Sequence, residues 1–564
     1  MKKTFIAACA SILVTASAAQ VSAGPATFVI NNANAAGVGF NDPAPRAPVG
    51  GNTGTTLGEQ RLKAFEHAAS LWSKRLDSSV PIRIRARFTA LGANVLGSAG
   101  AINGVVVTVT DDTTGVQTRL ILHPALANSL FGLDILTATD DIDANFSSDF
   151  DFYLGLDGNH GVKVDLVSVL LHEFAHGLGF AQYGNVSNGA LPTVSGVPVA
   201  DVYNQFLLDT STGKYWIQMT NAQRVAAATR FARIVLDAPG VKAALPSVLS
   251  FGSPELQVKQ PAAIAASLQF GTAVFGPRVG SPSVTAGVVA AADPSDAAGL
   301  ATTDGCSAFT NPGAVAGKIA LVERGTCGFV VKARNATEAG AVGVIIYNNA
   351  ANVGAAPPSM ADDGINGAFV TVPTVSVTRP DGLAILGQLA NDVVVGLTVD
   401  PTIRAGADAA GRPRVYAPFP VSPGSSISHY DTVAFRNLLM EPAISSDLTQ
   451  RLKAPFDLTS ELLYDEGWRF PDADHDTVVD DEDCNAASDL RATIFIGGIN
   501  TGVPNTLFQG GCSSADLIAQ LAATSVTHGD FVSRVAALRN AWRAAGLISG
   551  DQNGAIESAA ARAK

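Results

Sequence analysis

Hydrophobic and polar positions alternate in several distinct ways along the 564-residue chain. Between Leu57 and Leu76, apolar residues recur every three or four positions, which predicts an amphipathic helix. From Ile82 to Phe88, apolar residues alternate with arginines, which predicts a half-buried strand with a solvated arginine face. A similar alternation from Phe150 to Leu156 predicts a second strand, followed by a turn at residues 157–159. Residues 221–236 carry a further helical pattern.

A buried helix is predicted shortly after the second of these strands. Asp165 can accept hydrogen bonds from the first backbone N–H groups of such a helix, and Gly177 and Gly179 can end it. The positions between them are mostly apolar, including Leu170 and Phe174. A helix that is apolar on nearly every side is expected to lie in the interior of its domain.

The composition favours a folded chain without affinity for nucleic acid. Hydrophobic residues make up 47% of the chain and charged residues 15%, which excludes a wholly disordered protein. There are 37 basic and 49 acidic residues, so the formal net charge is −12. Because phosphate contacts need clustered lysine and arginine, no nucleic-acid partner is expected.

The first residues have the pattern of an export signal. Lys2 and Lys3 precede an apolar run from Phe5 to Val14, and residues 21–23 offer a cleavage site of small residues. We therefore assign residues 1–23 to a signal peptide and expect a secreted protein, in the periplasm or the medium. No later segment has the run of about 18 apolar residues that a transmembrane helix needs, so no stable membrane insertion is expected.

Four cysteines follow the signal peptide: Cys306, Cys327, Cys484 and Cys512. An even number of cysteines in an exported protein predicts disulfides. Of the three ways to pair them, the most economical joins Cys306 to Cys327 and Cys484 to Cys512. The alternative is four free thiols, which an oxidising compartment disfavours.

Residues 172–180 read HEFAHGLGF and contain the pattern HExxH. Two histidines four residues apart on a helix project from the same face, so His172 and His176 can bind one zinc ion. Glu173 lies one step around the helix, where its carboxylate can take a proton from a water molecule activated by the metal. The apolar flanks argue against an accidental HExxH on an exposed helix face. Zinc-dependent hydrolysis of peptide bonds is the expected chemistry.

A third zinc ligand has to come from elsewhere in the chain. Where the longer pattern HExxHxxGxxH has its third histidine, this sequence has Gln182, a weak ligand. Of the eight histidines, His123 and His160 precede the motif and stay open as ligands. His429 lies in the run SISHYD, which is followed by NLLMEP with Met440. A downstream acidic residue is a further alternative.

The runs SISHYD and NLLMEP resemble leishmanolysin-like metzincins, in which an insertion separates the active-site helix from a third histidine and a methionine turn follows it. Residues 458–468, which end in LLYDEGW, resemble the closing helix of those enzymes. The resemblance implies an α+β zincin fold in which His172, His176 and His429 bind zinc, Glu173 is the general base and Met440 lies beneath the metal. It also implies that the predicted strand of residues 149–156 pairs with the substrate. Tyr430 is a candidate for stabilising the oxyanion.

The separation of 253 positions from His176 to His429 is too long for a loop, so an inserted domain is expected. Within them, the runs GKIALVERGTC and AGAVGVIIYN, with a helical stretch between, predict a strand, a helix and a second strand. Residues 265–400 strongly resemble the protease-associated (PA) domain. The resemblance implies a small α/β module with a substrate-guiding or lid-like role, and a plain spacer is the alternative. The catalytic domain is then split into residues 24–260 and 405–470.

Residues 471–484 form an acidic segment. Carboxylates fall at positions 1, 3, 5, 9 and 12 of a calcium-loop pattern, and a backbone carbonyl is available at position 7; these residues are Asp472, Asp474, Asp476, Asp480, Asp483 and Val478. Thr477 and Asp483 replace the usual glycine and glutamate of such a loop. The segment resembles a thrombospondin type 3 calcium loop, which makes Ca²⁺ the candidate ion. A solvated acidic linker is the alternative.

Residues 485–564 are predicted to form a small helical module, because apolar residues recur at helical spacing from Ala515 to Ala561. Taken together, the sequence predicts a secreted zinc metalloendopeptidase that acts on protein or peptide substrates. The alternative is a non-catalytic secreted binding or adhesion protein on the same scaffold. The presence of Glu173 argues against that alternative, because a buried carboxylate is costly on an apolar helix.

Overall fold

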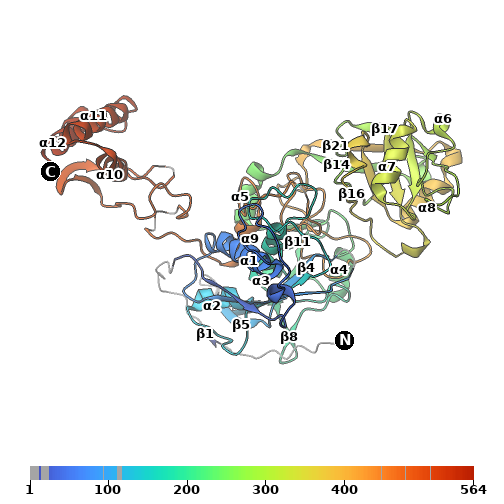
Figure 1. Cartoon of the computed structure of the whole chain (residues 1–564), viewed down its shortest axis with the longest axis horizontal. Coiled ribbons are helices and arrows are strands. Elements are labelled where there is room, and N and C mark those ends of the chain that lie inside the picture. Colours follow the sequence, from blue (N-terminus) through green and yellow to red (C-terminus); the bar gives the residue numbers. More distant parts are fainter. Residues whose placement is uncertain are drawn as a thin grey trace. The chain divides into compact units, whose positions relative to one another are not determined.

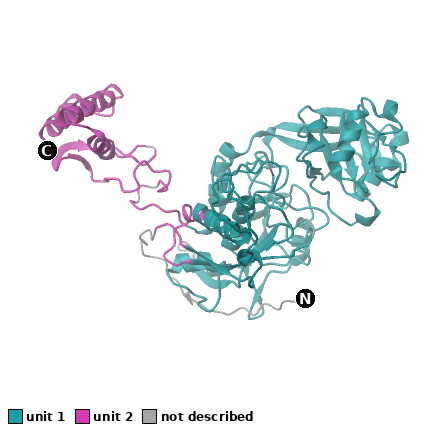
Figure 2. Cartoon of the chain, in the orientation of Figure 1, with its two compact units in different colours: residues 1–16, 28–71, 82–468 teal, residues 17–27, 72–81, 469–564 magenta. Residues whose placement is uncertain are grey.

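The computed structural model of the chain describes residues 12–13, 24–92, 95–110, 117–352, 354–445, 447–474, 476, 478–508 and 510–563. These residues form two compact units, coloured separately in Figure 2. The gaps aside, the first unit comprises residues 12–13, 28–71 and 82–468, and the second comprises residues 24–27, 72–81 and 469–563. The signal peptide predicted for residues 1–23 lies outside the described residues, apart from Ile12 and Leu13.

Within the first unit, a four-stranded sheet supports the helix that carries the HExxH motif (Figure 1). Its strands are ordered β2-β3-β7-β4, with the bounds Phe28–Asn32, Ile82–Thr89, Ile142–Ser147 and Gly97–Ala101. The first three strands are parallel, whereas β4 runs antiparallel to β7 and forms an edge of the sheet. Helices α1 (Leu57–Ser73) and α3 (Leu166–Leu178) pack together with the sheet through phenylalanine rings. The ring of Phe65 on α1 lies 4.9 Å from that of Phe146 on β7 and 5.8 Å from that of Phe174 on α3.

The predicted amphipathic helix and the predicted arginine strand are both confirmed. Helix α1 ends three residues before the predicted Leu76. In β3 the apolar positions are buried and the arginines between them are more exposed, as a strand with one buried face requires. Arg85 and Arg87 form ion pairs with Asp143 on the neighbouring strand, at 2.9 and 3.2 Å. The arginine face is therefore matched by an acidic residue of its own sheet.

Two predicted elements are wrong. Residues 150–156 form no strand, and their one β-bridge within the described residues joins Tyr153 to Asp165. Strand β4 already occupies the sheet edge beside β7, so Phe152 and Leu154 are buried by side-chain packing instead. The helix predicted for residues 221–236 ends at Ala227, as α4 (Asn221–Ala227). The last three residues of the predicted helix instead form β13 (Ile234–Leu236), because they pair with β11 (Leu207–Asp209) in a small sheet.

Shorter elements complete the first unit outside the insertion. They are β1 (Ile12–Leu13), β5 (Val105–Thr110), β6 (Gln117–Leu122), α2 (Pro124–Phe131), β8 (Thr193–Val194), β9 (Val197–Pro198), β10 (Ala200–Asp201), β12 (Lys214–Tyr215), α5 (Pro239–Val248) and α9 (Thr459–Glu466).

The insertion forms a mixed eight-stranded sheet with helices α6 (Pro312–Val315), α7 (Phe329–Glu338) and α8 (Arg379–Gly387), shown from light green to orange in Figure 1. The strands are ordered β15-β14-β21-β17-β18-β19-β20-β16. Their bounds, in chain order from β14 to β21, are Phe251–Gln260, Ala266–Ser267, Gly271–Thr272, Val284–Ala290, Ile319–Glu323, Gly343–Tyr347, Thr374–Val377 and Val394–Arg404. Strand β18, helix α7 and strand β19 form the predicted strand–helix–strand unit, and the two strands are parallel.

The inserted sheet begins earlier and ends later than the predicted limits of residues 265–400. Strands β14 and β21 pair antiparallel from Phe251 opposite Arg404 to Gln260 opposite Val394. Residues 251–260, assigned by the sequence pattern to the catalytic part, therefore belong to the insertion. The physical reason is that an inserted domain must bring its two ends side by side, and pairing the entry strand with the exit strand does this.

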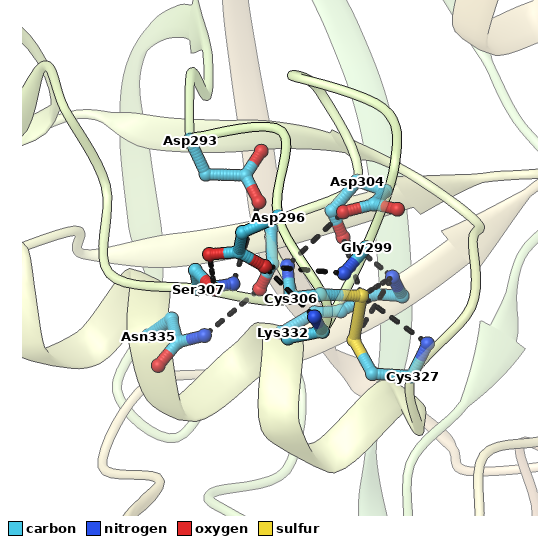
Figure 3. Close-up of a disulfide and its surroundings, with 11 residues drawn as sticks. Asp293, Asp296, Gly299, Asp304, Cys306, Ser307, Cys327, Lys332 and Asn335 are labelled. Carbon is cyan, nitrogen blue, oxygen red and sulfur yellow. Dashed lines mark hydrogen bonds between the residues drawn. A yellow bond between two sulfur atoms is a disulfide. The ribbon is translucent and has the colours of Figure 1, made fainter.

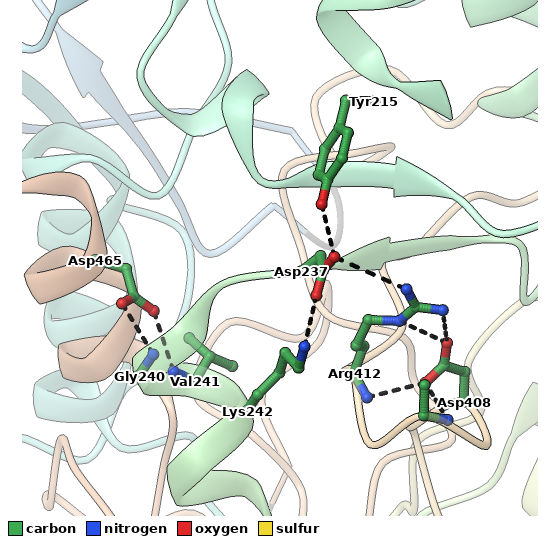
Figure 4. A network of polar contacts seen from close by, with 9 residues as sticks. Tyr215, Asp237, Gly240, Val241, Lys242, Asp408, Arg412 and Asp465 are labelled. Atoms are coloured by element: carbon green, nitrogen blue, oxygen red, sulfur yellow. Dashed lines mark hydrogen bonds and ion pairs between the residues drawn. The ribbon is translucent and has the colours of Figure 1, made fainter. Parts of the chain in front are cut away.

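Polar contacts join the chain before the insertion to the chain after it (Figure 4). Asp237 accepts hydrogen bonds from Tyr215 at 2.7 Å and Lys242 at 3.0 Å, and it lies 3.8 Å from the guanidinium of Arg412. At the start of α5, the backbone N–H groups of Gly240 and Val241 donate to Asp465 on α9, at 2.9 and 3.1 Å. These contacts hold together two segments that the insertion separates in sequence.

Both predicted disulfides are present, joining Cys306 to Cys327 and Cys484 to Cys512. In the inserted domain, the first disulfide lies against Lys332, whose side chain is fully buried (Figure 3). The ammonium of Lys332 donates to the backbone carbonyl of Asp304 and lies 3.3 Å from the sulfur of Cys306. Burial lowers the pKa of Lys332 to about 8.

In the second unit, the region predicted to be helical contains α10 (Ser514–Thr524), α11 (His528–Ala544) and α12 (Gly550–Arg562). It also contains a hairpin of β22 (Thr493–Ile496) and β23 (Ile499–Pro504), which the helical prediction for residues 485–564 missed. The helices and the hairpin share one core that includes Ile518, Phe531 and Trp542. In the described part of the chain, no helix is both long and apolar enough to cross a membrane.

Candidate metal centre

Helix α3 is buried along its whole length, and its ends are as predicted. The carboxylate of Asp165 accepts hydrogen bonds from the backbone N–H groups of Val167 and Ser168, at 3.3 and 3.2 Å, and the helix ends with Gly179 as its C-cap. These contacts satisfy donors that a helix start leaves without partners. His172 and His176 are therefore carried by a fully packed helix.

Short backbone pairings return the chain from the insertion to α3. The N–H of Leu236 in β13 donates to the carbonyl of Pro413 at 2.9 Å, and the N–H of Val415 donates to the carbonyl of Ile234 at 2.8 Å. One step further, the N–H of Tyr416 donates to the carbonyl of His429 at 2.9 Å. The third histidine is thus positioned by successive backbone pairs that begin at β13.

The three histidine side chains converge. Nε2 of His172 lies 3.1 Å from Nε2 of His176 and 3.2 Å from Nε2 of His429, although His172 and His429 are 257 residues apart. The ring centroids are 4.8 to 5.1 Å apart. All three residues are buried, and their ligand atoms lie within 4.8 Å of one another.

The other nitrogen of each ring contacts a backbone carbonyl. Nδ1 of His172 lies 2.7 Å from the carbonyl oxygen of Leu439, Nδ1 of His176 lies 2.7 Å from that of Phe180, and Nδ1 of His429 lies 2.8 Å from that of Ser425. A carbonyl can only accept a hydrogen bond, so each neutral ring carries its proton on Nδ1. The three Nε2 lone pairs then face one another, an arrangement that a bound cation would stabilise. Orientation of metal-binding histidines by backbone carbonyls is common in metalloproteins.

Burial keeps the three rings neutral at physiological pH. It lowers the pKa of His172 to about 3 and that of His176 to about 4, and repulsion from His176 adds to the effect on His172. Burial also holds the pKa of His429 well below its usual value. Neutral imidazole is the form that binds a metal ion.

Glu173 lies against the edge strand β4. A Cβ atom at Gly97 would lie 3.0 Å from both Cγ and Oε1 of Glu173, so the strand approaches the carboxylate closely because residue 97 has no side chain. Burial raises the pKa of Glu173 to about 8, against the opposing effect of a hydrogen bond with the backbone of Ala99. A cation held by the histidines would favour the ionised carboxylate.

Met440 lies in a tight turn directly beside the histidines. The N–H of Glu441 donates to the carbonyl of Leu438 at 3.2 Å, and the N–H of Tyr430 donates to the carbonyl of Met440 at 2.8 Å. The Met440 side chain is fully buried. Leu439, whose carbonyl contacts His172, is held in turn by Asp457, which accepts from its N–H at 2.7 Å. The turn therefore orients the first histidine of the motif.

Other residues singled out in the sequence lie elsewhere. The hydroxyl of Tyr430 is buried and donates to the carbonyl of Leu458 at 3.4 Å, so this side chain is committed to the core rather than to an oxyanion. Nδ1 of His160 lies 2.7 Å from the carbonyl of Lys163 in an exposed turn. His123 is buried against Tyr183 and is not part of the group of three histidines.

In the acidic segment, Asp472, Asp474 and Asp476 come together, with ligand atoms within 4.8 Å of one another. Asp480 does not belong to this group, since its Oδ1 accepts from the N–H of Ala473 at 2.8 Å. Val478 uses its N–H to donate to Oδ1 of Asp476 at 2.8 Å, and Oδ1 of Asp483 accepts from the N–H of Asn485 at 3.0 Å. Thr477 lies outside the described residues.

Several contacts at the histidine cluster have no signal in the sequence. Gly97 and Ala99 lie in an ordinary small-residue run, and nothing marks the carbonyl of Leu439 or the carboxylate of Asp457 as part of the site. Each of them reaches the cluster through tertiary packing.

Comparison with known proteins identifies part of the insertion: residues 284–385 match the family model of the PA domain. Human ER degradation-enhancing alpha-mannosidase-like protein 3 is 39% identical over 125 residues, which is 22% of this chain and 13% of that protein. An aminopeptidase of Pseudomonas aeruginosa (strain UCBPP-PA14) is 54% identical over 65 residues, 12% of each protein. Leucine aminopeptidase 2 of Trichophyton rubrum is 40% identical over 85 residues, 15% of this chain and 16% of that protein.

These matches are short. The chain spans between 11% and 18% of the length of the curated relatives that it matches. These relatives are named for different activities, as mannosidase-like proteins and as aminopeptidases. Among solved structures, an aminopeptidase from Aneurinibacillus sp. strain AM-1 is 21% identical over 27% of this chain and 31% of that chain, with a TM-score of 0.19. A likeness of that size bears on neither fold nor function.

The sheets and helices of the structure, together with the match to the family model, show a mixed α/β fold with an inserted PA domain.

Proposed function

We propose that the chain is a zinc-dependent metallopeptidase with a PA domain inserted into its catalytic domain. The observation that carries the proposal is the convergence of the three Nε2 atoms, each on a ring whose Nδ1 contacts a backbone carbonyl. Three histidines with one ligand position left open form the usual ligand set of a catalytic zinc site. The aminopeptidase names of several relatives agree with peptidase chemistry.

Each residue of the cluster has a separate part in the proposed reaction. His172, His176 and His429 hold the zinc ion, and the Leu439–Met440 turn orients the first of them. Zinc bound there supplies Lewis acidity, which acidifies a water molecule and polarises a peptide carbonyl. Glu173 accepts the proton of the attacking water and passes it to the amine that leaves.

The finer proposal is an endopeptidase of the metzincin-like type. Its support is the combination of a distant third histidine, a tight turn with a buried methionine after it, and an edge strand beside the general base. Strand β4 is the last strand of its sheet, and no other strand of the described residues pairs with its outer edge; it approaches Glu173 closely at Gly97. A substrate that adds to this edge lies extended across the site, with residues on both sides of the cleaved bond, as an endopeptidase requires. In this role β4 replaces the stretch of residues 149–156.

Substitution of Glu173 by glutamine tests the function. Glu173→Gln should keep one zinc ion per chain and lose cleavage of casein, because the amide cannot accept the proton. Wild type should cleave casein, and a chelator should abolish the activity. A wild type that instead releases only N-terminal residues from peptides would refute the endopeptidase type and favour an aminopeptidase.

Metal analysis of His429→Ala separates this proposal from its alternatives. Loss of zinc in that variant supports the three-histidine site. Zinc retained in His429→Ala would indicate a different third ligand, such as an acidic residue. Little zinc in wild type would favour the non-catalytic binding or adhesion protein.

We also propose that the protein is exported. The support is the signal-like pattern of residues 1–23 and the two disulfides, which are typical of oxidising compartments. Expression in a bacterial host, followed by N-terminal sequencing of the periplasmic fraction, tests the proposal. Export predicts a chain that begins at or near Gly24.

A further inference from the structure

The acidic segment of the second unit contains an unusual concentration of negative charge. Seven of the twelve residues from 472 to 483 are aspartate or glutamate. The nearby cation Arg75 forms ion pairs with two exposed members, Asp481 and Glu482, both at 2.6 Å. The guanidinium is thus paired with two exposed carboxylates, whereas the carboxylates at 472, 474 and 476 are less exposed.

Three other carboxylates of the segment form a tight group. Asp472, Asp474 and Asp476 place ligand atoms within 4.8 Å of one another. The N–H of Asp476 donates to Oδ1 of Asp472 and of Asp474, at 3.1 and 3.2 Å, which folds the three alternate residues into a closed loop. Like charges repel at such separations, so a bound cation would stabilise this loop.

Asp476 carries the decisive feature. It is only 6% exposed, and its Oδ2 atom is buried without a hydrogen-bond partner among the described residues. Oδ2 of Asp483 is also buried without a partner. Both side chains face Gly511, because a Cβ atom there would lie 3.1 Å from Oδ2 of Asp476 and closer still to Oδ1 of Asp483. A buried carboxylate oxygen without a partner is costly unless a ligand satisfies it.

We infer that Asp472, Asp474, Asp476 and Asp483 bind one calcium ion. All four donors are hard carboxylate oxygens, which suit Ca²⁺, whereas zinc prefers imidazole and thiolate ligands. Ca²⁺ takes about six to eight oxygens in a flexible geometry, so backbone carbonyls and water can complete the shell. Mg²⁺ demands a stricter octahedral arrangement, so calcium is preferred over magnesium.

The proposed calcium site lies beside the disulfide of the second unit. Gly511 adjoins Cys512, whose disulfide to Cys484 closes the same segment, and the N–H of Ser488 donates to Oδ2 of Asp474 at 2.6 Å. Calcium would therefore fasten Asp472, Asp474 and Asp476 to the segment that leads into helix α10 within the second unit. This role is independent of the histidine cluster and of the proposed peptidase activity.

Calcium binding to the full-length chain tests the inference. The chain is freed of metal by dialysis and equilibrated with Ca²⁺ alone, or with Mg²⁺ alone, and the bound metal per chain is measured. Wild type should bind one Ca²⁺ per chain and bind Mg²⁺ more weakly. Asp476→Asn should weaken calcium binding by about tenfold or more, because it removes a charged ligand.

Asp481→Asn is the matched control, since Asp481 lies in the same segment but pairs with Arg75. It should bind calcium as wild type does. Asp474→Asn gives a second test in case Asp476→Asn does not fold, and it should also weaken binding. No calcium bound by wild type, or equal binding by the Asp474, Asp476 and Asp481 variants, would overturn the inference.

Discussion

A methyl group added to strand β4 should impair the general base without removing the metal ligands. In Gly97→Ala, the new Cβ would lie 3.0 Å from Cγ and Oε1 of Glu173 and 3.2 Å from its Cδ. Ordinary contact between such atoms begins near 3.4 Å, so Glu173 or the strand must shift by a few tenths of an ångström. Overpacking of this kind costs about 1–3 kcal/mol.

If that cost is met by displacing Glu173, the rate of peptide cleavage falls by roughly 5- to 160-fold, since about 1.4 kcal/mol corresponds to a factor of ten. Loss of alignment at a general base has effects of similar size. Zinc content should not change, because the three heavy atoms nearest the added Cβ all belong to Glu173 and none to a histidine. The assay is the steady-state cleavage of casein together with zinc content per chain.

The same strand offers a matched control. At Gly100, an added Cβ has no heavy atom within 4 Å in the described part of the chain. Gly100→Ala should therefore cleave at close to the wild-type rate. Equal rates for Gly97→Ala and Gly100→Ala, at equal zinc content, would refute the argument that β4 positions Glu173. Loss of zinc in Gly97→Ala alone would show that the strand acts on the histidines instead.

Three further predictions concern other parts of the first unit. Asp457→Ala leaves the N–H of Leu439 without its acceptor, so zinc affinity should fall about 10- to 100-fold in a metal-competition assay. Among the residues that the structure describes, neither carboxylate oxygen of Glu466 has a hydrogen-bond partner, and burial holds its pKa well above the usual value. The folded chain therefore keeps a proton on Glu466 that the unfolded chain releases, so the free energy of unfolding falls as pH rises. The melting temperature of wild type should fall between about pH 5 and about pH 9, and that of Glu466→Gln should fall less over the same range. Removing the disulfide with Cys306→Ser and Cys327→Ser frees a loop of 21 residues, which should lower the free energy of unfolding by about 3 kcal/mol in denaturant titrations.

The elements that the sequence predicted correctly depend on local patterns. Helix α3 could be placed because Asp165, the apolar run and Gly179 are adjacent in sequence and satisfy one helix. Cys306 and Cys327 lie on the same short stretch of the inserted domain, so their pairing required no knowledge of the fold. The two histidines of HExxH share a helix face by periodicity alone.

Contacts between residues far apart in the sequence depended on the tertiary structure. An alternating pattern does not say where in a sheet a strand would lie. The resemblance therefore assigned the substrate to residues 149–156, whereas the structure has β4 at the sheet edge. The Nδ1 partners of the histidines are backbone carbonyls, which every residue has, and hence no sequence signal marks Leu439 or Ser425. His429 could be suggested from the sequence by resemblance, but its approach to His172 across 257 residues depends on backbone pairing and packing that no local pattern encodes.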